Sequence, residues 1–185
     1  MRTLGILLVL MFWSAVANAQ RVTVLDEAKI GFAPISSEVT EDGDRFTFVV
    51  NESYHREFEL NPLAFMDEYF SIENFMNKVA YKKYDSYEVS FNSSKGSLRA
   101  FFDKEGNLQK TKQRFVNILL PAELRHQLYR DHKGWEMVKN VYVAKGEGAT
   151  ITKSLYKVKL ERDGDKKRIK FKFNPHASNT GVASN

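Results

Sequence analysis

The chain contains no cysteine among its 185 residues. It can therefore form no disulfide, and its mature N-terminus cannot be a lipid-bearing cysteine. Stability has to come from a hydrophobic core alone, and 14 Phe and 8 Tyr residues supply apolar surface for one. The length is enough for one compact domain or two small ones.

Long hydrophobic runs are scarce, and the only pronounced one lies near the N-terminus. Arg2 gives a basic start, Leu4–Trp13 is almost wholly apolar, and Ala17–Ala19 has the small-x-small form that signal peptidase accepts. We expect residues 1–19 to be a cleaved signal peptide of a secreted or periplasmic protein; an N-terminal membrane anchor is the alternative. No later run could serve as a transmembrane anchor in a mature chain beginning at Gln20.

The charge is only mildly positive, with 28 Lys+Arg against 23 Asp+Glu and a formal net charge of +5. A modest positive charge on a small exported protein is typical of a soluble surface. The sequence also contains no recognisable stacking platform or base-reading motif. We therefore expect no nucleic-acid partner.

Motifs for catalysis are missing as well. There is no glycine-rich phosphate loop, nucleophile elbow or paired metal motif. His126 and His132 are six residues apart on one expected helix, whereas two ligands on a helix need a spacing of three or four; His55 falls in an expected strand and His176 in the tail. These patterns favour a noncatalytic protein with no cofactor and no metal, although an acid pair distant in sequence stays possible.

Residues 20–61 are expected to form a strand-rich N-terminal segment. Glu41–Asp44 has the composition of a turn, and Phe46–Val50 is rich in the β-branched and aromatic residues that favour strands. Tyr54–Leu60 alternates larger apolar or long side chains with charged ones, which predicts a second strand and hence a hairpin.

A helical unit begins after this segment. Asn61 is a good helix cap and Pro62 suits the first helical position. Apolar residues then recur at helical spacing as far as Val79, with a break predicted near Ser71. An aromatic-rich face of this kind could dock a partner, but core packing is the favoured interpretation.

Three strands should follow within residues 62–118. Tyr87–Phe91 alternates, Ser97–Phe102 forms the next strand, and Asp103–Asn107 is a tight turn. The acidic residues of this turn could indicate calcium, but two carboxylates are too few for a dedicated site. Leu108–Phe115 is polar and basic through Lys110, Lys112 and Arg114, which predicts an edge strand.

Residues 119–174 repeat the same plan. Leu120, Leu124 and Leu128 recur at four-residue spacing and predict a helix, which Gly134 would end. Three strands follow, and residues 175–185 are expected to be a disordered tail. The predicted fold class is thus α+β: an antiparallel sheet with helices packed on one face, built as a tandem helix-strand-strand-strand repeat over 62–118 and 119–174.

Several short motifs support a family resemblance. They are Ala100–Leu108, Leu119–Leu124, the aromatic Tyr129, Gly134–Trp135 and the hairpin strand Tyr156–Leu160. With these motifs the chain resembles the PepSY-like family of small secreted or periplasmic bacterial proteins, whose fold is related to the tandem β-lactamase-inhibitor architecture. The resemblance implies a binding or inhibitory module. Its motifs are turn and packing residues, so it implies no contact residues.

The last predicted hairpin carries a dense set of basic side chains, which we treat as candidate contacts for an anionic partner. They are Lys157, Lys159, Lys166, Lys167, Arg168, Lys170 and Lys172. Such a face could attract a phosphorylated glycan or a lipid headgroup. A solvated sheet face that discourages edge aggregation has the same pattern and is the favoured interpretation.

Three functions remain open on the sequence. The first is a noncatalytic secreted or periplasmic module that recognises an envelope protein or peptide. The second is an envelope-maintenance protein that contacts an anionic glycan or lipid through its basic sheet face. The third is an unrecognised hydrolase.

Overall fold

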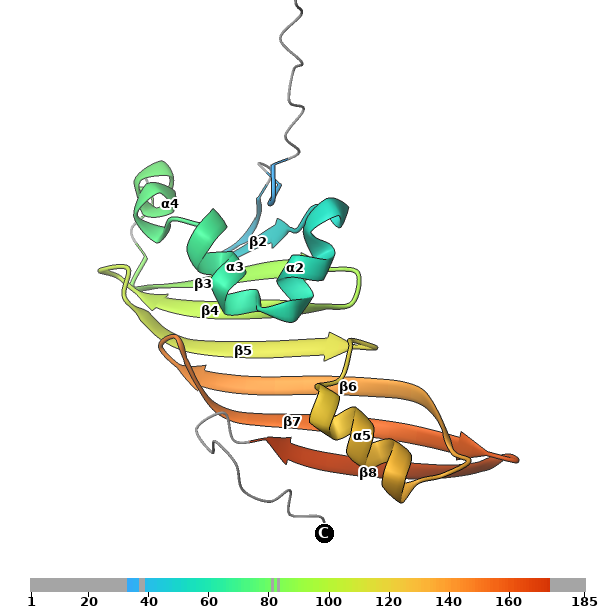
Figure 1. The fold of residues 1–185 in the computed structure, drawn as a ribbon. Coiled ribbons are helices and arrows are strands. Elements are labelled where there is room, and N and C mark those ends of the chain that lie inside the picture. Colours follow the sequence, from blue (N-terminus) through green and yellow to red (C-terminus); the bar gives the residue numbers. More distant parts are fainter. Residues whose placement is uncertain (1–32, 37–38, 81, 83, 174–185) are drawn as a thin grey trace, which may run out of the picture. The chain divides into compact units, whose positions relative to one another are not determined.

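The computed structural model describes residues 33–36, 39–80, 82 and 84–173, which form an α+β fold (Figure 1). The expected signal peptide and the expected disordered tail lie outside the described residues. The strands are β1 (Thr40–Asp42), β2 (Arg45–Val49), β3 (Ser86–Ser93), β4 (Gly96–Asp103), β5 (Leu108–Val116), β6 (Glu136–Glu147), β7 (Thr150–Arg162) and β8 (Asp165–Phe173). The helices are the 3-10 turn η1 (Glu52–Tyr54), α2 (His55–Leu60), α3 (Pro62–Tyr69), α4 (Ile72–Lys78) and α5 (Ala122–Asp131).

All eight described strands belong to one sheet, in the order in which they occur in the sequence. Neighbouring strands are antiparallel except β2 and β3, which run parallel. The sheet is therefore mixed, and the predicted antiparallel sheet is wrong. The cause is the helical segment between β2 and β3, because a parallel neighbour requires a long crossover that carries the chain back to the starting end.

The predicted tandem repeat is also wrong. Three short helices precede β3 to β5, whereas α5 alone precedes β6 to β8. The last unit has strands of 12 and 13 residues in β6 and β7, against 8 residues in β3 and β4, and the hairpin of β1 and β2 at the other end of the sheet has no counterpart. Similar patterning in the two halves thus reflects similar local rules and not a repeated unit.

The segment Tyr54–Leu60, predicted as a strand, is helical. Its alternation does not mark a buried sheet face, because Phe58 is fully buried while Leu60 is 68% exposed. The ring of Phe58 packs 5.1 Å from that of Phe65 and 5.4 Å from that of Phe115, centroid to centroid. Phe58 is thus the buried side chain of this short helix and packs it against the sheet.

The predicted helix start at Pro62 and the break near Ser71 are confirmed. The Asn61 side chain accepts a hydrogen bond from the Ala64 amide at 3.2 Å. The Ser71 hydroxyl likewise accepts from the Asn74 amide and begins α4. These two caps satisfy amides that have no partner within their helices, and so they separate α3 from α4.

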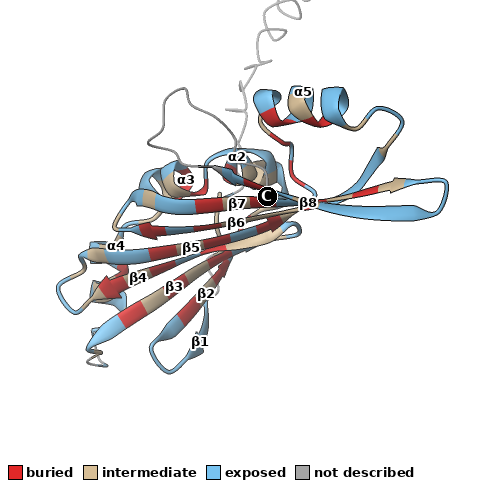
Figure 2. Ribbon diagram, turned by 90° about the horizontal axis from the view of Figure 1, so that it is seen from below, coloured by how far each residue is buried: buried red, intermediate tan, exposed pale blue. Residues whose placement is uncertain are grey.

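The helices cover one face of the sheet, which we call the inner face (Figure 1). Side chains from both layers form the core, and buried positions recur along the strands (Figure 2). In the N-terminal half Phe46 contacts Phe75 at 4.8 Å between ring centroids, so core packing of this helical face is confirmed. In the C-terminal half Leu124 and Leu128 of α5 are buried, as the leucine spacing predicts.

The opposite face of the sheet, the outer face, is covered by no helix of the described chain. The strand β5 illustrates how the two faces alternate. Thr111 and Phe115 are buried on the inner face, while Lys110, Lys112 and Arg114 lie on the outer face. The edge position predicted for this strand is wrong, because β5 pairs with β4 and with β6. In the described part of the chain no helix is long and apolar enough to span a membrane.

Candidate functional site

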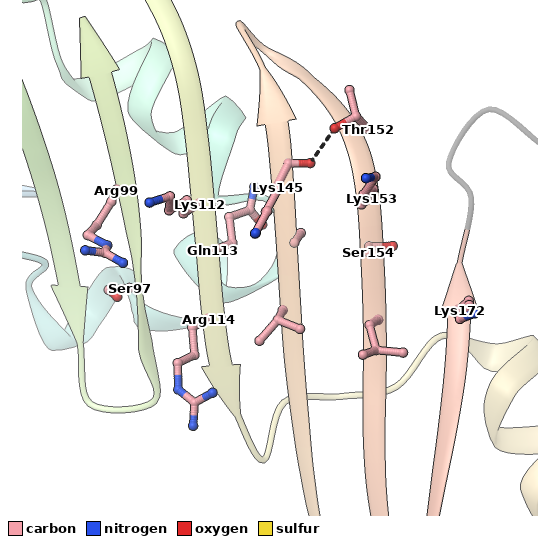
Figure 3. A pocket seen from close by; sticks show the side chains of 13 residues that line it. Ser97, Arg99, Lys112, Gln113, Arg114, Lys145, Thr152, Lys153, Ser154 and Lys172 are labelled. Carbon is pink, nitrogen blue, oxygen red and sulfur yellow. Dashed lines mark hydrogen bonds between the residues drawn. The ribbon is translucent and has the colours of Figure 1, made fainter.

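Four basic residues form a continuous line across the outer face. Arg99 pairs with Lys112, Lys112 with Lys145, and Lys145 with Lys153, each as direct cross-strand partners. We call this line the basic row (Figure 3). Its four strands, β4 to β7, are adjacent, and neighbouring strands lie about 4.8 Å apart, so the row is roughly 14 Å long.

The basic row is poorly neutralised. Arg99 forms an ion pair with Glu88 at 3.3 Å, and Glu88 also pairs with Arg45. The Lys112 ammonium lies 5.0 Å from the centre of the Phe101 ring, a cation–π contact. Within the described residues no carboxylate comes within 4.0 Å of the ammonium groups of Lys112, Lys145 or Lys153. Like charges directly opposite one another destabilise a sheet, so the row works against folding.

The next rung of the sheet has a different composition. Arg114 pairs with Val143, Val143 with Leu155, and Leu155 with Lys172. Two half-buried apolar side chains therefore lie between two exposed cations on the outer face. We call Val143 and Leu155 the apolar floor.

The two rungs line a hollow of about 930 Å³, the outer hollow (Figure 3), and Val143 and Leu155 are among its lining residues. Its lining residues are Ser97, Arg99, Lys112, Gln113, Arg114, Val143, Ala144, Lys145, Thr152, Lys153, Ser154, Leu155 and Lys172. The volume falls within the range of roughly 300–1,000 Å³ that is usual for ligand sites. Six of the lining residues are basic, and none is acidic or aromatic. The outer hollow is therefore suited to an anion that also has apolar surface.

The seven basic residues singled out in the sequence separate into several groups. Lys157 faces Lys170 and Lys159 faces Arg168 across the pairing of β7 and β8, all on the outer face. These four residues form a basic field beside the outer hollow, but they do not line it.

The other three residues differ from one another in their surroundings. Lys166 is the cross-strand partner of Glu161, at the far end of the same hairpin. Lys167 lies on the inner face, where its ammonium is 5.9 Å from the centre of the Trp135 ring. Lys172 alone lines the outer hollow. The hairpin set is thus not one contiguous contact surface.

Sequence reasoning missed five of the basic residues that line the outer hollow. They are Arg99, Lys112, Arg114, Lys145 and Lys153. The available signal was alternation, since Lys110, Lys112 and Arg114 occupy every second position of one strand. That signal would have sufficed only with the strand register, which brings Lys112 opposite Lys145 across 32 residues of intervening sequence.

A second, smaller hollow of about 390 Å³ lies on the inner face between the helices. Tyr142 and Tyr156 are among its lining residues, and their ring centroids are 4.7 Å apart. Burial raises the pKa of Tyr156 to about 12, with a further contribution from the neighbouring Tyr142. Both phenols therefore stay neutral at physiological pH and contribute polarity but no charge to this space.

The histidines that the structure describes do not converge. His55 lies in α2, where its Nε2 is 3.0 Å from the Val50 carbonyl oxygen and its Nδ1 is 3.3 Å from the Ser94 hydroxyl. His126 lies on α5 and His132 at its C-terminal end, while His176 is outside the described residues. Over the described ranges no three His, Asp or Glu side chains group in a way that could hold a metal ion.

Comparison of the chain with protein-family models, with curated proteins and with solved structures finds no match. The PepSY-like resemblance therefore gains no support from these comparisons, and the site has to be interpreted from its own chemistry.

Proposed function

We propose that this protein is a noncatalytic binding module that takes an anionic ligand in the outer hollow. The observation that supports this most directly is the basic row. Three of its four cations have no carboxylate within 4.0 Å among the described residues, although each faces another cation directly. A bound anion would relieve this repulsion, so binding and folding favour the same arrangement.

The proposal retains anion contact through a basic sheet face, as considered from the sequence, but assigns it to different residues. The contact lies on β4 to β7 and not on the last hairpin, which provides only Lys172. Export to the periplasm or the cell exterior remains part of the proposal, because it rests on the leader-like pattern of residues 1–19. An anionic component of the cell envelope is the natural ligand class for such a protein.

The experiment is a nuclear magnetic resonance titration with tripolyphosphate, a linear anion without apolar surface. We expect shifts concentrated on β4 to β7 and an affinity that falls as salt rises. The double variant Lys112→Gln/Lys145→Gln should bind about tenfold more weakly, because two exposed ion pairs contribute up to about 1 kcal/mol each.

The matched control is Lys166→Gln/Arg168→Gln, which removes the same charge from the last hairpin outside the outer hollow. It should bind tripolyphosphate within about twofold of the unaltered protein. If both double variants lost the same affinity for tripolyphosphate, the cause would be net charge, which would contradict a site at the basic row.

A second candidate function is favoured by the position of β8. Among the described residues this strand pairs only with β7, so its other edge can accept an added strand. Its Lys166, Lys170 and Lys172 would favour an acidic peptide, which agrees with recognition of an envelope protein or peptide. Amide hydrogen exchange in β8 should slow on addition of such a peptide; unchanged exchange would contradict this candidate.

A further inference from the structure

We infer that the ligand of the outer hollow is a single anionic amphiphile, with its acidic headgroup on the basic row and its hydrocarbon chain on the apolar floor. This inference rests on the proposed function and names the class of ligand. It starts from the contrast between adjacent rungs of the sheet. The basic row carries four cations in succession, whereas the next rung places Val143 and Leu155 between Arg114 and Lys172.

The apolar surface continues beyond the floor. On the following rung Val116 pairs with Val141, and both are half-buried on the outer face. Leu155, Val143, Val141 and Val116 therefore form an apolar strip that begins beside the basic row and continues along β6 and β5, while Lys157 faces Val141 on β7. A chain laid on this strip would extend away from the headgroup, as an alkyl phosphate or a fatty acid requires.

The composition of the hollow is less suitable for a purely polar polyanion. None of the 13 lining residues is aromatic, so the hollow offers no flat ring on which a sugar could pack. A polyanion would also gain nothing from Val143 and Leu155, which break the line of cations on the second rung. The apolar strip is thus the feature that separates an amphiphile from a linear polyanion.

Charge elsewhere in the fold supports the approach of an anion from the outer side. The helices α2 to α4 lie on the inner face and carry five acidic residues but only two basic ones. The acidic residues are Glu57, Glu59, Asp67, Glu68 and Glu73. This separation gives the outer face a positive potential, which steers anions toward it.

The form of the site favours one molecule over a bilayer. The headgroups of a bilayer form a broad surface, whereas the cations here border a hollow of about 930 Å³. A layer of headgroups would contact the cations but would place no hydrocarbon chain on Val143 and Leu155. The ligand is therefore a single amphiphile molecule that leaves its membrane or micelle to bind.

The test is calorimetric titration with alkyl phosphates of six to twelve carbons, kept below their micelle concentrations. Full burial of one methylene would tighten binding about fourfold, equivalent to about 0.8 kcal/mol. Because an open hollow covers roughly half of a chain, we expect about twofold for each added methylene. Alkyl maltosides of equal length should bind at least tenfold more weakly, since they lack the anion.

Two variants separate the headgroup from the chain. Val143→Thr nearly preserves side-chain volume but adds a hydroxyl, so it should reduce the gain per methylene while leaving tripolyphosphate affinity unchanged. Lys112→Gln/Lys145→Gln should weaken every alkyl phosphate by a similar factor. Val49→Thr is the matched control, because Val49 is 59% exposed on β2 and lies outside the hollow. Thermal unfolding of each variant establishes that it is folded.

The outcomes distinguish the two proposals. If affinity does not change with alkyl chain length while tripolyphosphate still binds, the amphiphile inference is wrong but anion binding is still supported. Absence of binding to both probes overturns both. Equal affinity for maltosides and phosphates reduces the effect to adsorption on apolar surface and contradicts the inference. Binding to phosphatidylglycerol vesicles without binding to monomeric alkyl phosphates would favour a membrane surface and also contradict it.

Discussion

Lys112 and Lys145 are direct cross-strand partners at the centre of the outer face. Their side chains belong to the same face of the sheet, and Lys153 continues the line on the next strand. A sheet selected for stability alone would place an acid at one of these positions. The three lysines on adjacent strands therefore repel one another, and a bound anion would offset this repulsion.

Replacing Lys145 by Glu should stabilise the protein. The new carboxylate would face Lys112 and Lys153, which replaces two repulsive pairs by two attractive ones. We expect a gain of about 0.5–1 kcal/mol in the free energy of unfolding at low salt, and a smaller gain at 1 M salt. Urea denaturation at both salt concentrations measures it, and binding of tripolyphosphate should fall in the same variant.

The control for this variant is Lys166→Glu. Lys166 faces Glu161, so the same change of charge creates a repulsive pair and should lower stability slightly. If both variants shifted stability in the same direction, net charge and not the basic row would be the cause.

Thr111→Val should leave stability unchanged or raise it by about 1 kcal/mol. The Thr111 hydroxyl oxygen is buried and has no hydrogen-bond partner among the described residues. Valine has nearly the same shape and removes the uncompensated polar atom. Thr152→Val is the control, because its exposed hydroxyl donates to the Lys145 carbonyl oxygen at 3.3 Å. Thermal or urea unfolding measures the change. A decrease of more than about 1 kcal/mol in the free energy of unfolding of Thr111→Val would indicate a hydrogen-bond partner of the Thr111 hydroxyl.

Leu124→Ala should lower the free energy of unfolding by about 2–5 kcal/mol. Leu124 is 3% exposed and holds the buried side of α5 against the sheet, together with Leu128. Tyr129→Ala on the same helix is the control; Tyr129 is 74% exposed, so its removal should change stability by less than about 0.5 kcal/mol. Urea denaturation measures both variants. Equal losses in the free energy of unfolding would contradict this assignment of the α5 face.

Acid should loosen the turn between β4 and β5. Amide donors of Asn107, Glu105 and Gln109 hydrogen-bond to the Asp103 carboxylate and hold its pKa below the ordinary value of 3.8, with the Asn107 side chain contributing most. Because this pKa is lower in the folded state, the stability it contributes is fully present above pH 3.8 and is lost as pH falls through the depressed value.

The measurement is the difference in stability between the unaltered protein and Asp103→Ala as a function of pH. The difference should be constant at neutral pH and should shrink as pH is lowered below 3.8. A difference that stayed constant down to pH 2 would show that the carboxylate charge does not support the turn.

Local features of the fold were predictable because each depends on a few adjacent residues. The cap at Asn61, the break at Ser71 and the leucine face of α5 all follow from short-range rules. The strand predicted at Tyr54–Leu60 failed because alternation there involved long charged side chains and only one buried residue, Phe58. Alternation predicts a strand reliably only where one of its two faces is buried.

Features that depend on strand pairing were not predictable from the same patterns. Lys112 has the sequence context of an edge strand, because an exposed outer face gives central strands the same polar alternation as edge strands. The basic row was missed for this reason, since its four members lie on different strands and only the register aligns them. The hairpin lysines were conspicuous because they are close in sequence, which is a different property from closeness across the sheet.

The parallel pairing of β2 with β3 has a consequence for synthesis of the chain. Strands β3 to β8 each pair with the strand before or after them in sequence, so each can pair soon after it is made. The strand β2 emerges before three helices and must wait for β3. At roughly 5–20 residues per second this delay lasts a few seconds, during which β2 has only the short strand β1 beside it and lacks its other neighbour β3. The hairpin of β1 and β2 is therefore made first in the described sheet but stays separate from the rest of it until three helices and β3 have followed.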